Sequence, residues 1–475
     1  MVNANVLSER YATPEINYIF SDEGKIFAER GLWIAVMKSQ KEFGLEIPPE
    51  DIEKFERAKE NIDLERIKEI ERKTRHDVKA KIQDFVNVSG AGEYLHMGMT
   101  SRDLTDNVEQ MQIMKASKII FGKHVSALRH LIEKSESYND IIIPARTHHQ
   151  AAQPTLLGKR FSMWAEELMT HLKPFESFIE NYSLRGIKGP VGTQSDMLEL
   201  LGSKEKVEGL EQKIAEHLGF KKTLVSTGQI YPRSLDLALS SHLVNLSSAY
   251  ENFAITMRLM AGYELVTEGF KEGQVGSSAM PHKMNTRSSE RINTFGGLLK
   301  MYQDGMSRIS GNQWEEGDVS DSGIRRAVIQ DIFYTADGQL ETTLTVLNEM
   351  GIYEEMIKRE LEEYLPLLAT TQILMKAVEK GIGREEAHKI IKNYSIAEVL
   401  KKRKTGEKMK VLERISQDPT FSKAGISYDL LKQTVSNLEN LLGNAREQIE
   451  DVSSKANYWI AKYSQDAAYE PMEIL

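Results

Sequence analysis

The chain has 475 residues, 61 of them Lys or Arg and 70 Asp or Glu, for a formal charge of −9, and it contains no cysteine. The missing thiols exclude disulfides, thiolate zinc sites and iron–sulfur clusters. An acidic chain is poorly suited to nucleic acid, whose phosphate backbone needs a basic face. No apolar run reaches the ~18 residues of a membrane span, and the N-terminus lacks the basic stretch and apolar core of a signal peptide. We therefore expect a cytoplasmic protein without membrane or nucleic-acid partners.

The elements predicted along the chain are almost all helices. Residues 1–108 are typical of shorter helices with charged surfaces, and residues 366–475 of shorter amphipathic ones. In the centre, residues 109–365, apolar side chains recur at steps of four and three from Leu239 to Met260, the spacing of one helix face. Similar patterns predict three more long helices, at about 157–175, 292–309 and 323–350. We therefore predict an all-α fold of three helical domains, 1–108, 109–365 and 366–475, with a long central bundle.

Histidines in polar company mark two candidate segments in the first third of the chain. His76 lies between Arg75 and Asp77, and His96 lies shortly before Thr100 and Ser101. Histidine is the natural proton donor near neutral pH. Neither segment shows the i, i+4 spacing expected of paired zinc ligands, so we expect no catalytic metal.

A third segment with histidines runs from Arg146 to Thr155 and includes His148 and His149. It follows a short apolar run and precedes a predicted helix. Two adjacent histidines cannot easily face one point, so at most one of them acts as an acid. A polar helix start with incidental histidines is the alternative interpretation.

The segment 272–291, EGQVGSSAMPHKMNTRSSER, differs most from the helical background. Successive small residues let backbone N–H groups face a common concavity that holds an anion. Ser277 and Ser278 offer hydroxyls, Lys283 a positive charge and Asn285 an amide. A hydroxyl becomes a useful base only where cations and donors stabilise its alkoxide. Composition alone equally allows a flexible loop with a surface lysine.

A further polar segment, residues 313–322, is followed by Arg325 and Arg326. Serine and arginine at a helix start suit a phosphate, because the arginine fork and the free N–H groups both face the anion. Helix capping by Asp321 or Ser322, with exposed arginines, is the simpler interpretation of this segment alone.

Together these segments resemble a known family. Residues 276–285, GSSAMPHKMN, are similar to the signature loop (GSSxMPxKxN) of the fumarase, aspartase and argininosuccinate lyase superfamily. Further similarities narrow the resemblance to the adenylosuccinate lyase family, at residues 8–15, 75–78, 98–101, 146–148, 188–193, 321–322 and 325–326. The similarity extends from about residue 8 to residue 400. It implies an all-helical, three-domain homotetramer whose active sites are each built from three subunits and need no cofactor.

The resemblance also implies roles for individual residues in releasing fumarate from adenylosuccinate and from a succinylated imidazole ribotide. Ser277 is then the general base and His148 the general acid of a trans elimination, and Lys283 with Asn285 and loop amides stabilises the carbanion. Thr100 and Ser101 hold the succinyl carboxylates, with Gln229 nearby. The positions matched to the nucleotide and its phosphate are Arg10, Tyr11, Arg75, His76, Arg291, Ser322 and Arg326. Further substrate contacts are expected from Asp77, His96, Ser278 and Met280, and the glycines at 269, 273 and 276 are expected to act as hinges of the serine loop.

Two positions depart from the family pattern. Gly317 stands where an arginine often contacts substrate, and Thr286 stands where proline often follows Asn285. Neither change affects the expected acid or base. The sequence leaves two alternatives open, a sister lyase with another succinyl substrate and a helical scaffold without activity. The phosphate-type residues Ser322 and Arg326 disfavour the first, and the intact acid and base disfavour the second.

Overall fold

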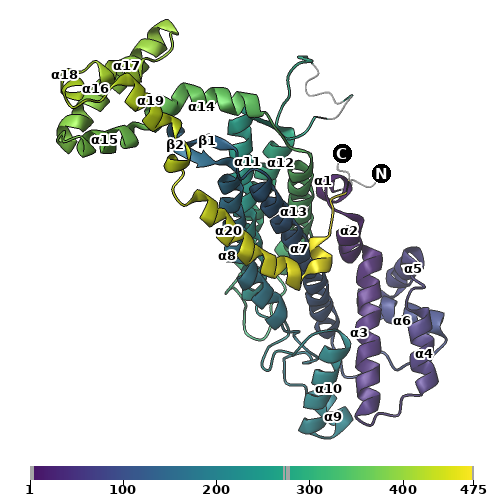
Figure 1. The fold of residues 1–475 in the computed structure, drawn as a ribbon. Helices are drawn as coiled ribbons and strands as arrows, with labels where there is room; N and C mark the ends of the chain where they lie inside the picture. The colour runs from purple at the N-terminus through teal and green to yellow at the C-terminus, as the bar shows by residue number, and fades with distance from the viewer. Residues whose placement is uncertain (1–4, 271–272, 274–278, 473–475) are drawn as a thin grey trace.

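Five long helices form the middle of the molecule in the computed structural model, which describes residues 5–270, 273 and 279–472 (Figure 1). They are α7 (Ser101–Ser137), α8 (Leu157–Asn181), α11 (Ser234–Gly262), α12 (Arg287–Ile309) and α13 (Ser322–Glu349). The last four confirm the helices predicted from apolar spacing. In α11, for example, Leu239, Leu243 and Leu246 are all buried in the largest core cluster.

Helix α7 lacks a clear apolar stripe because it is buried on most of its faces. Polar side chains such as Asp103, Lys123 and His124 are buried in it beside Leu128 and Leu131. A helix that is buried on all sides has no solvent-exposed polar face, so its sequence does not alternate between apolar and polar residues with the helical period. The sequence pattern therefore did not single it out.

The N-terminal helices pack at one end of the bundle around a second core cluster that includes Trp33, Phe55 and Phe85. Beside these rings, Arg30 forms a buried ion pair of 2.8 Å with Asp84. The helices around this cluster are α3 (Asp22–Glu42), α4 (Pro49–Ala58) and α6 (Asp77–Ser89), and α5 (Leu64–Thr74) packs on α6. Helices α1 (Val6–Arg10) and α2 (Pro14–Phe20) instead bury Leu7, Ile16 and Ile19 in the largest core cluster. The short helices α9 (Ser195–Leu201) and α10 (Lys204–His217) join the second cluster.

The C-terminal part forms a third cluster at the opposite end and then returns to the bundle (Figure 1). Its elements are α14 (Glu354–Leu368), α15 (Thr370–Glu379), α16 (Arg384–Thr405), α17 (Val411–Ser416), α18 (Pro419–Lys423), α19 (Tyr428–Ser436), the 3₁₀ turn η1 (Glu439–Leu441), α20 (Ala445–Lys462) and α21 (Ser464–Ala467). Helix α20 packs along α7 and α8, and at its end the ring centres of Phe121 and Tyr463 are 4.9 Å apart. Residues 366–475 thus contribute to two hydrophobic cores. The predicted division into domains 1–108, 109–365 and 366–475 stays a prediction.

Two small antiparallel sheets interrupt the helices. Strand β1 (Ile142–Thr147) pairs with β2 (Gln150–Leu156), and β3 (Val266–Thr267) pairs with β4 (Gly351–Ile352). The predicted all-α class is confirmed, because helices make up nearly all of the regular structure. The segment 146–155, however, is a hairpin, so its interpretation as a polar helix start is wrong.

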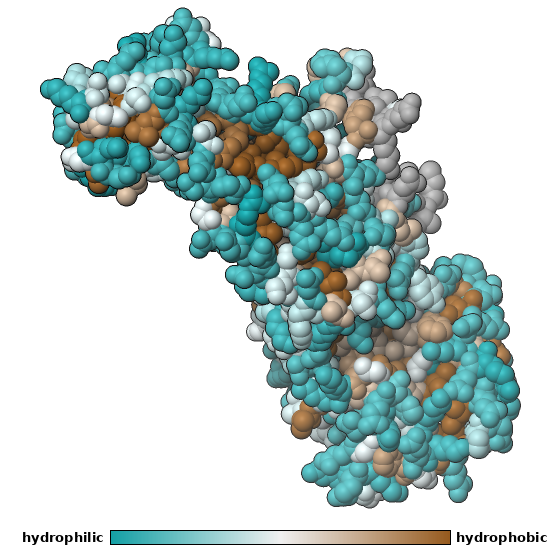
Figure 2. Space-filling model, in the orientation of Figure 1, coloured by the Kyte–Doolittle hydropathy of each residue, from teal (hydrophilic) through white to brown (hydrophobic). Residues whose placement is uncertain are grey.

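Most of the visible surface is hydrophilic, but apolar side chains gather near β1, β2 and the adjacent end of α11 (Figure 2). Helix α11 exposes Ile255 and Leu259, and its C-cap residue Tyr263 is also exposed, each by more than two fifths. These residues are four apart and so lie on one face of the helix. Among the helices of the described segments, none combines the length and apolar character that a bilayer crossing requires.

Candidate active site

His148 lies at the tip of the β1–β2 hairpin, where a two-residue turn reverses the chain. Thr147 pairs with Gln150, which leaves His148 and His149 as the turn, with φ of 50° and 58°. Positive φ at both central residues matches the twist of a two-residue hairpin, but it is uncommon outside glycine and several-fold enriched for histidine. The hairpin therefore presents the His148 imidazole in the solvent-exposed position that a proton donor to a bound substrate needs.

The neighbouring side chains fix this hairpin to α14. Arg146 forms an ion pair with Glu360, and its guanidinium carbon lies 4.4 Å from the centre of the Tyr263 ring. It also donates a hydrogen bond of 3.3 Å to the backbone carbonyl of His149. The His149 ring contacts Tyr263 at 5.7 Å between ring centres. His149 thus has a ring contact that His148 does not share in the described structure, and the expectation that at most one of the two histidines acts as an acid stays a prediction.

The predicted serine loop is described only in part. Ser277 and Ser278 lie outside the described residues, while Met280, Lys283 and Asn285 lie within them. The backbone N–H of Lys283 donates to the carbonyl of Met280 at 3.0 Å, which makes a turn, and the Lys283 side chain is exposed. Asn285 lines a hollow of about 420 Å³, together with Glu268, Phe270, His282, Tyr353 and Met356 among others.

Glu268 closes the base of this loop. Its carboxylate accepts hydrogen bonds from the backbone N–H groups of Ser288 and Ser289, at 2.8 and 2.9 Å, at the start of α12. The next residue, Gly269, has φ of +100°, and a Cβ atom there would lie 2.7 Å from the Cβ of Glu349. The first of the three expected hinge glycines is therefore packed against α13. Gly273 also has positive φ, and Gly276 lies outside the described residues.

At the other end of the bundle, α7 begins with a capping box. The backbone N–H of Thr100 donates to the Asp103 carboxylate at 2.7 Å, and Ser101 is the first helical residue. Nearby, the Trp33 indole N–H donates to Nδ1 of His96 at 3.2 Å. Burial lowers the pKa of His96 below its ordinary value. The His96 imidazole is accordingly neutral near pH 7, with its proton on Nε2 because Nδ1 accepts.

Asp103 is the buried anchor of this end of the site. It forms an ion pair with Arg185 and accepts from the backbone N–H groups of Lys188 and Gly189 at 2.8 and 3.1 Å. Arg185 in turn donates to the carbonyl of Gly228 at 3.0 Å. Both side chains of the ion pair are fully buried. The pair therefore holds the start of α7 and the segment before Gln229 in a fixed relation, and sequence reasoning did not identify either residue.

Asp103→Asn should lower the free energy of unfolding by about 3–5 kcal/mol, because it leaves the buried Arg185 without its counter-charge. Urea unfolding at one fixed protein concentration measures the change. Asp63→Asn is the matched control, since Asp63 also caps a helix but its side chain is 52% exposed. Asparagine caps a helix about as well as aspartate, so this variant should stay within about 0.5 kcal/mol of the wild type. Equal stability of the two variants would contradict the anchoring role.

The corner between α5 and α6 supplies Arg75, His76 and Asp77. Arg75 has φ of 52° and ends α5, and the His76 side chain accepts from the backbone N–H of Lys79 at 3.3 Å to cap α6. Nδ1 of His76 lies 3.6 Å from the Asp77 carboxylate. All three side chains are exposed. The electrostatic effect of the nearby His76 is one of the smaller contributions to the lowered pKa of His96. The structure thus brings these two candidate segments together.

Gln229 lies against the segment that precedes α13. Its backbone N–H donates to the carbonyl of Glu316 at 2.6 Å, and a Cβ atom at Gly317 would lie 2.7 Å from the Cβ of Gln229. This close approach leaves no room for a side chain at Gly317. Packing against Gln229 therefore explains why glycine stands where the family often has arginine. Ser322 begins α13, and Asp321 pairs with Arg233 instead of capping the helix.

Of the two adjacent arginines in α13, Arg325 is buried and Arg326 is exposed. Arg325 donates to Asp236 at 2.8 Å and to Glu109 at 2.6 Å, which joins α13 to α11 and α7. Arg325 is therefore committed to holding three helices together. Arg326 stays the predicted phosphate contact of this pair.

A third set of candidate residues lies beside the middle of α13, near Gly338. The Arg291 guanidinium carbon lies 5.0 Å from the centre of the Tyr11 ring, and Tyr11 packs edge-on against Phe295 at 5.2 Å. Two residues on, Thr13 donates to the buried Asp337 carboxylate from its backbone N–H and its hydroxyl, at 2.6 and 2.8 Å. The short helix α1, which ends with Arg10, is thereby fixed next to the start of α12.

The candidate residues of one chain thus fall into three groups. The hairpin–loop group consists of His148, Met280, Lys283 and Asn285. The α7-start group consists of Arg75, His76, Asp77, His96, Thr100, Ser101, Gln229, Ser322 and Arg326. The α1–α12 group consists of Arg10, Tyr11 and Arg291.

Helix α7 separates the first two groups. It has 37 residues, so at ~1.5 Å per residue it is about 55 Å long. It runs from the end of the bundle near α9 and α10 to the end near β1 and β2 (Figure 1). One chain therefore does not bring His148 and Thr100 to a common substrate. Within the described residues, no group of three or more His, Asp or Glu side chains is placed to hold a metal ion.

Solved structures identify the fold of the chain. The chain superposes with a TM-score of 0.82 on the 3-carboxy-cis,cis-muconate lactonizing enzyme of Pseudomonas putida, covering 96% of this chain and 100% of that one at 18% identity. A fumarate lyase from Mesorhizobium sp. BNC1 gives 0.79, over 94% and 99%, also at 18% identity. The fold is that of the fumarate lyase superfamily.

Sequence comparisons define the family within this class. Residues 25–298 match a family model described as Lyase, and residues 366–452 match one described as Adenylosuccinate lyase C-terminus. The chain is 33% identical over 455 residues to an adenylosuccinate lyase of Saccharomyces cerevisiae, covering 94% of this chain and 93% of that protein. It is 32% identical to that of Schizosaccharomyces pombe, with the same coverage. The chain belongs to the adenylosuccinate lyase family, which confirms the predicted resemblance, and it is a lyase.

Proposed function

We propose that this lyase cleaves adenylosuccinate to AMP and fumarate, and the succinyl-aminoimidazole-carboxamide ribotide (SAICAR) to AICAR and fumarate, in purine nucleotide biosynthesis. The observation that carries the proposal is the match to adenylosuccinate lyases along 94% of the chain. The exposed, positively charged and amide side chains of the three groups suit a substrate that bears two carboxylates and a phosphate.

The reaction is an elimination that balances without a cofactor. The Ser277 alkoxide removes the proton beside the succinyl carboxylate, the carbon–nitrogen bond breaks, and its electron pair passes to the nitrogen. His148, as the imidazolium, protonates that nitrogen. Charge develops on the carboxylate next to the carbanion, so the Lys283 ammonium and the Asn285 amide stabilise the transition state there. Fumarate and the free amine are the products.

The hairpin supports the role of His148. A general acid must keep one orientation toward the leaving nitrogen while its ring stays accessible. The paired strands and the Arg146 contacts supply the rigidity, and the turn supplies the exposure. Backbone with positive φ at a non-glycine residue is strained, and such strain clusters at functional sites.

The nucleotide part of the substrate is assigned to cations and donors from separate elements. Arg291 beside Tyr11 combines a charge with an aromatic ring, which suits a phosphate and a base. Ser322 and Arg326 offer a hydroxyl and a guanidinium at the start of α13, where free N–H groups also favour an anion. His76 and Arg75 complete this set from the corner between α5 and α6.

We further propose that the lyase is a homotetramer whose active sites each take residues from three subunits. The length of α7 supports this, because the hairpin–loop and α7-start groups of one chain lie too far apart to bind one substrate. The exposed apolar stripe of α11, residues Ile255, Leu259 and Tyr263, also supports assembly. Contiguous exposed apolar surface is typical of protein–protein interfaces.

A direct assay tests the proposed function. Purified protein mixed with adenylosuccinate should change the ultraviolet spectrum as AMP forms, and SAICAR should give AICAR in the same way. Argininosuccinate, which carries no phosphate, is the discriminating substrate. Turnover of argininosuccinate alone would support a sister lyase, and no turnover of any of the three would support a scaffold without activity.

A further inference from the structure

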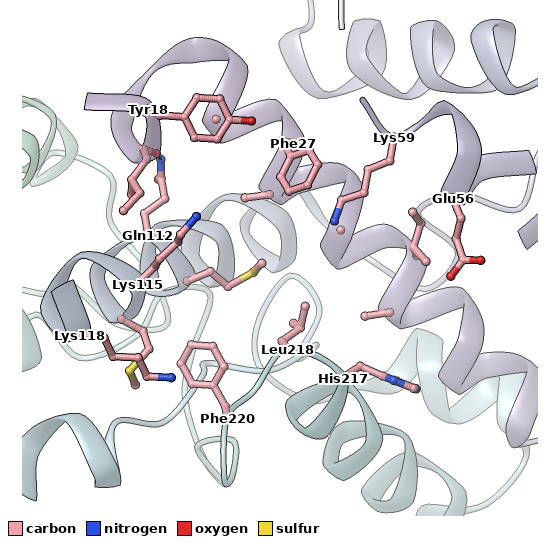
Figure 3. Close-up of a pocket in the computed structure, with 18 of the residues that line it drawn as sticks. Tyr18, Phe27, Glu56, Lys59, Gln112, Lys115, Lys118, His217, Leu218 and Phe220 are labelled. Atoms are coloured by element: carbon pink, nitrogen blue, oxygen red, sulfur yellow. Dashed lines mark hydrogen bonds between the residues drawn. The ribbon is translucent and has the colours of Figure 1, made fainter. Parts of the chain in front are cut away.

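A cavity of about 640 Å³ lies between α3, α7 and the end of α10 (Figure 3). None of the residues assigned to the lyase site lines it. Its volume falls within the ~300–1,000 Å³ that is usual for small-molecule sites. The cavity is therefore large enough for a ligand of its own.

The walls of this cavity combine apolar rings with ammonium groups. Phe27 and Phe220 line it together with Tyr18, Ile34, Met111, Met114 and Leu218. Lys59 approaches from the side of Phe27, and Lys115 and Lys118 approach from the opposite side (Figure 3). This is a concentration of positive charge in a chain whose formal charge is −9.

The positive charge is not neutralised within the cavity. Glu56 is the only carboxylate among the lining residues, and it forms an ion pair of 2.5 Å with Lys38. Within the described part of the chain, Lys59, Lys115 and Lys118 have no ion pair. The cavity therefore holds three ammonium groups that an anion can neutralise.

Lys59 is the best placed of the three. Its ammonium lies 3.9 Å from the centre of the Phe27 ring and is half-buried. Burial lowers the pKa of Lys59, and the nearby Glu60 and Glu56 offset only part of that cost. A cation in such a place gains more from a bound anion than an exposed lysine does, because its charge is less well solvated.

A glycine in the middle of α3 makes room for this ammonium. A Cβ atom at Gly31 would lie 3.0 Å from Nζ of Lys59 and 3.3 Å from its Cε. Glycine weakens a helix interior relative to alanine. Here its missing side chain lets the end of Lys59 lie against the helix and reach the cavity.

We propose that this cavity is a second ligand site, separate from the lyase site, for an aromatic anion. The flat ring of the ligand packs between Phe27 and Phe220, and its sulfonate, carboxylate or phosphate group binds the Lys59 ammonium. Lys115 and Lys118 add attraction from the opposite wall. The site selects an apolar ring joined to a negative group, because its walls present both apolar rings and ammonium groups.

Titration of the full-length protein with 8-anilinonaphthalene-1-sulfonate, an aromatic anion whose fluorescence rises in apolar surroundings, tests the proposal. We expect saturable binding at one site per chain. Lys59→Met keeps most of the apolar stem but removes the charge, so the Kd should rise about tenfold or more, the usual effect of losing a charged hydrogen bond. Lys389→Met is the matched control, because Lys389 is an exposed lysine on α16, and it should leave the Kd unchanged.

A second variant keeps the charge and fills the space. Gly31→Val puts a side chain where the Lys59 ammonium lies, and it should also weaken binding of the probe. Far-UV circular dichroism and an unchanged midpoint of urea unfolding show that both variants fold. Displacement by 1-naphthoate but not by guanosine monophosphate would identify an aromatic acid as the ligand class, and the reverse result a nucleotide.

Three results would overturn the proposal: no saturable binding, equal affinity of the Lys59→Met variant and the wild type, or displacement of the probe by adenylosuccinate. The last would place the probe in the lyase site. None of these results bears on whether the protein turns over adenylosuccinate, so the two proposals fail independently.

Discussion

Ser277→Ala should lower the turnover number with adenylosuccinate by about 10²–10⁴-fold, the usual contribution of one positioned acid or base. The substitution removes only the hydroxyl that we propose takes the proton from the succinyl arm. Helical circular dichroism and the oligomeric state should not change. A continuous ultraviolet assay at saturating substrate measures the loss.

Ser288→Ala is the matched control for this experiment. Ser288 lies in the first turn of α12, close to the same loop, and its backbone N–H, not its hydroxyl, donates to Glu268. Turnover should therefore be retained. If the Ser277→Ala variant stays fully active, the base is misassigned, whatever the substrate proves to be.

The second large effect is recovery of activity from two inactive variants. His148→Gln removes the proposed acid in the hairpin–loop group. Thr100→Asp places a carboxylate where the substrate's carboxylate is expected to bind, while aspartate still caps the helix. Each variant alone should be nearly inactive. Because α7, about 55 Å long, separates these two positions of one chain, co-expression should assemble some sites with both groups native.

In a closed oligomer, each site takes its hairpin–loop group from one copy and its α7-start group from another. When the two variant chains assort at random, each group is native in about half of the sites, so both are native in about a quarter. The mixed enzyme should therefore reach up to about a quarter of wild-type activity per site. Each variant co-expressed with itself under a second tag is the control. No recovery in a confirmed mixed oligomer, or full activity of a dilute monomer, would contradict a shared site.

The helices illustrate what a local pattern is able to predict. The apolar residues from Leu239 to Met260 predicted α11, because their helical spacing can be recognised within that segment alone. No contact with a distant part of the chain has to be known. Helix α7 was not singled out because most of its faces are buried. The hairpin was missed for a related reason: its turn uses two histidines in place of the Asn-Gly or Asp-Gly that normally marks a two-residue turn.

The anchors of the site were missed because their partners are distant in sequence. Asp103 and Arg185 are 82 positions apart in the sequence, and Arg325 and Glu109 are 216 positions apart. Nothing near either residue marks it as half of a buried pair.

By itself, the sequence determined the helical class, the family, and the side chains proposed for the chemistry, since helix period and motif order are local properties of the chain. The tertiary structure decided where those side chains lie. It placed those of the described residues in three groups along an elongated bundle, because the length and direction of α7 depend on packing against α8, α13 and α20. It also formed the Lys59 cavity, whose walls come from helices that meet only when the chain is folded.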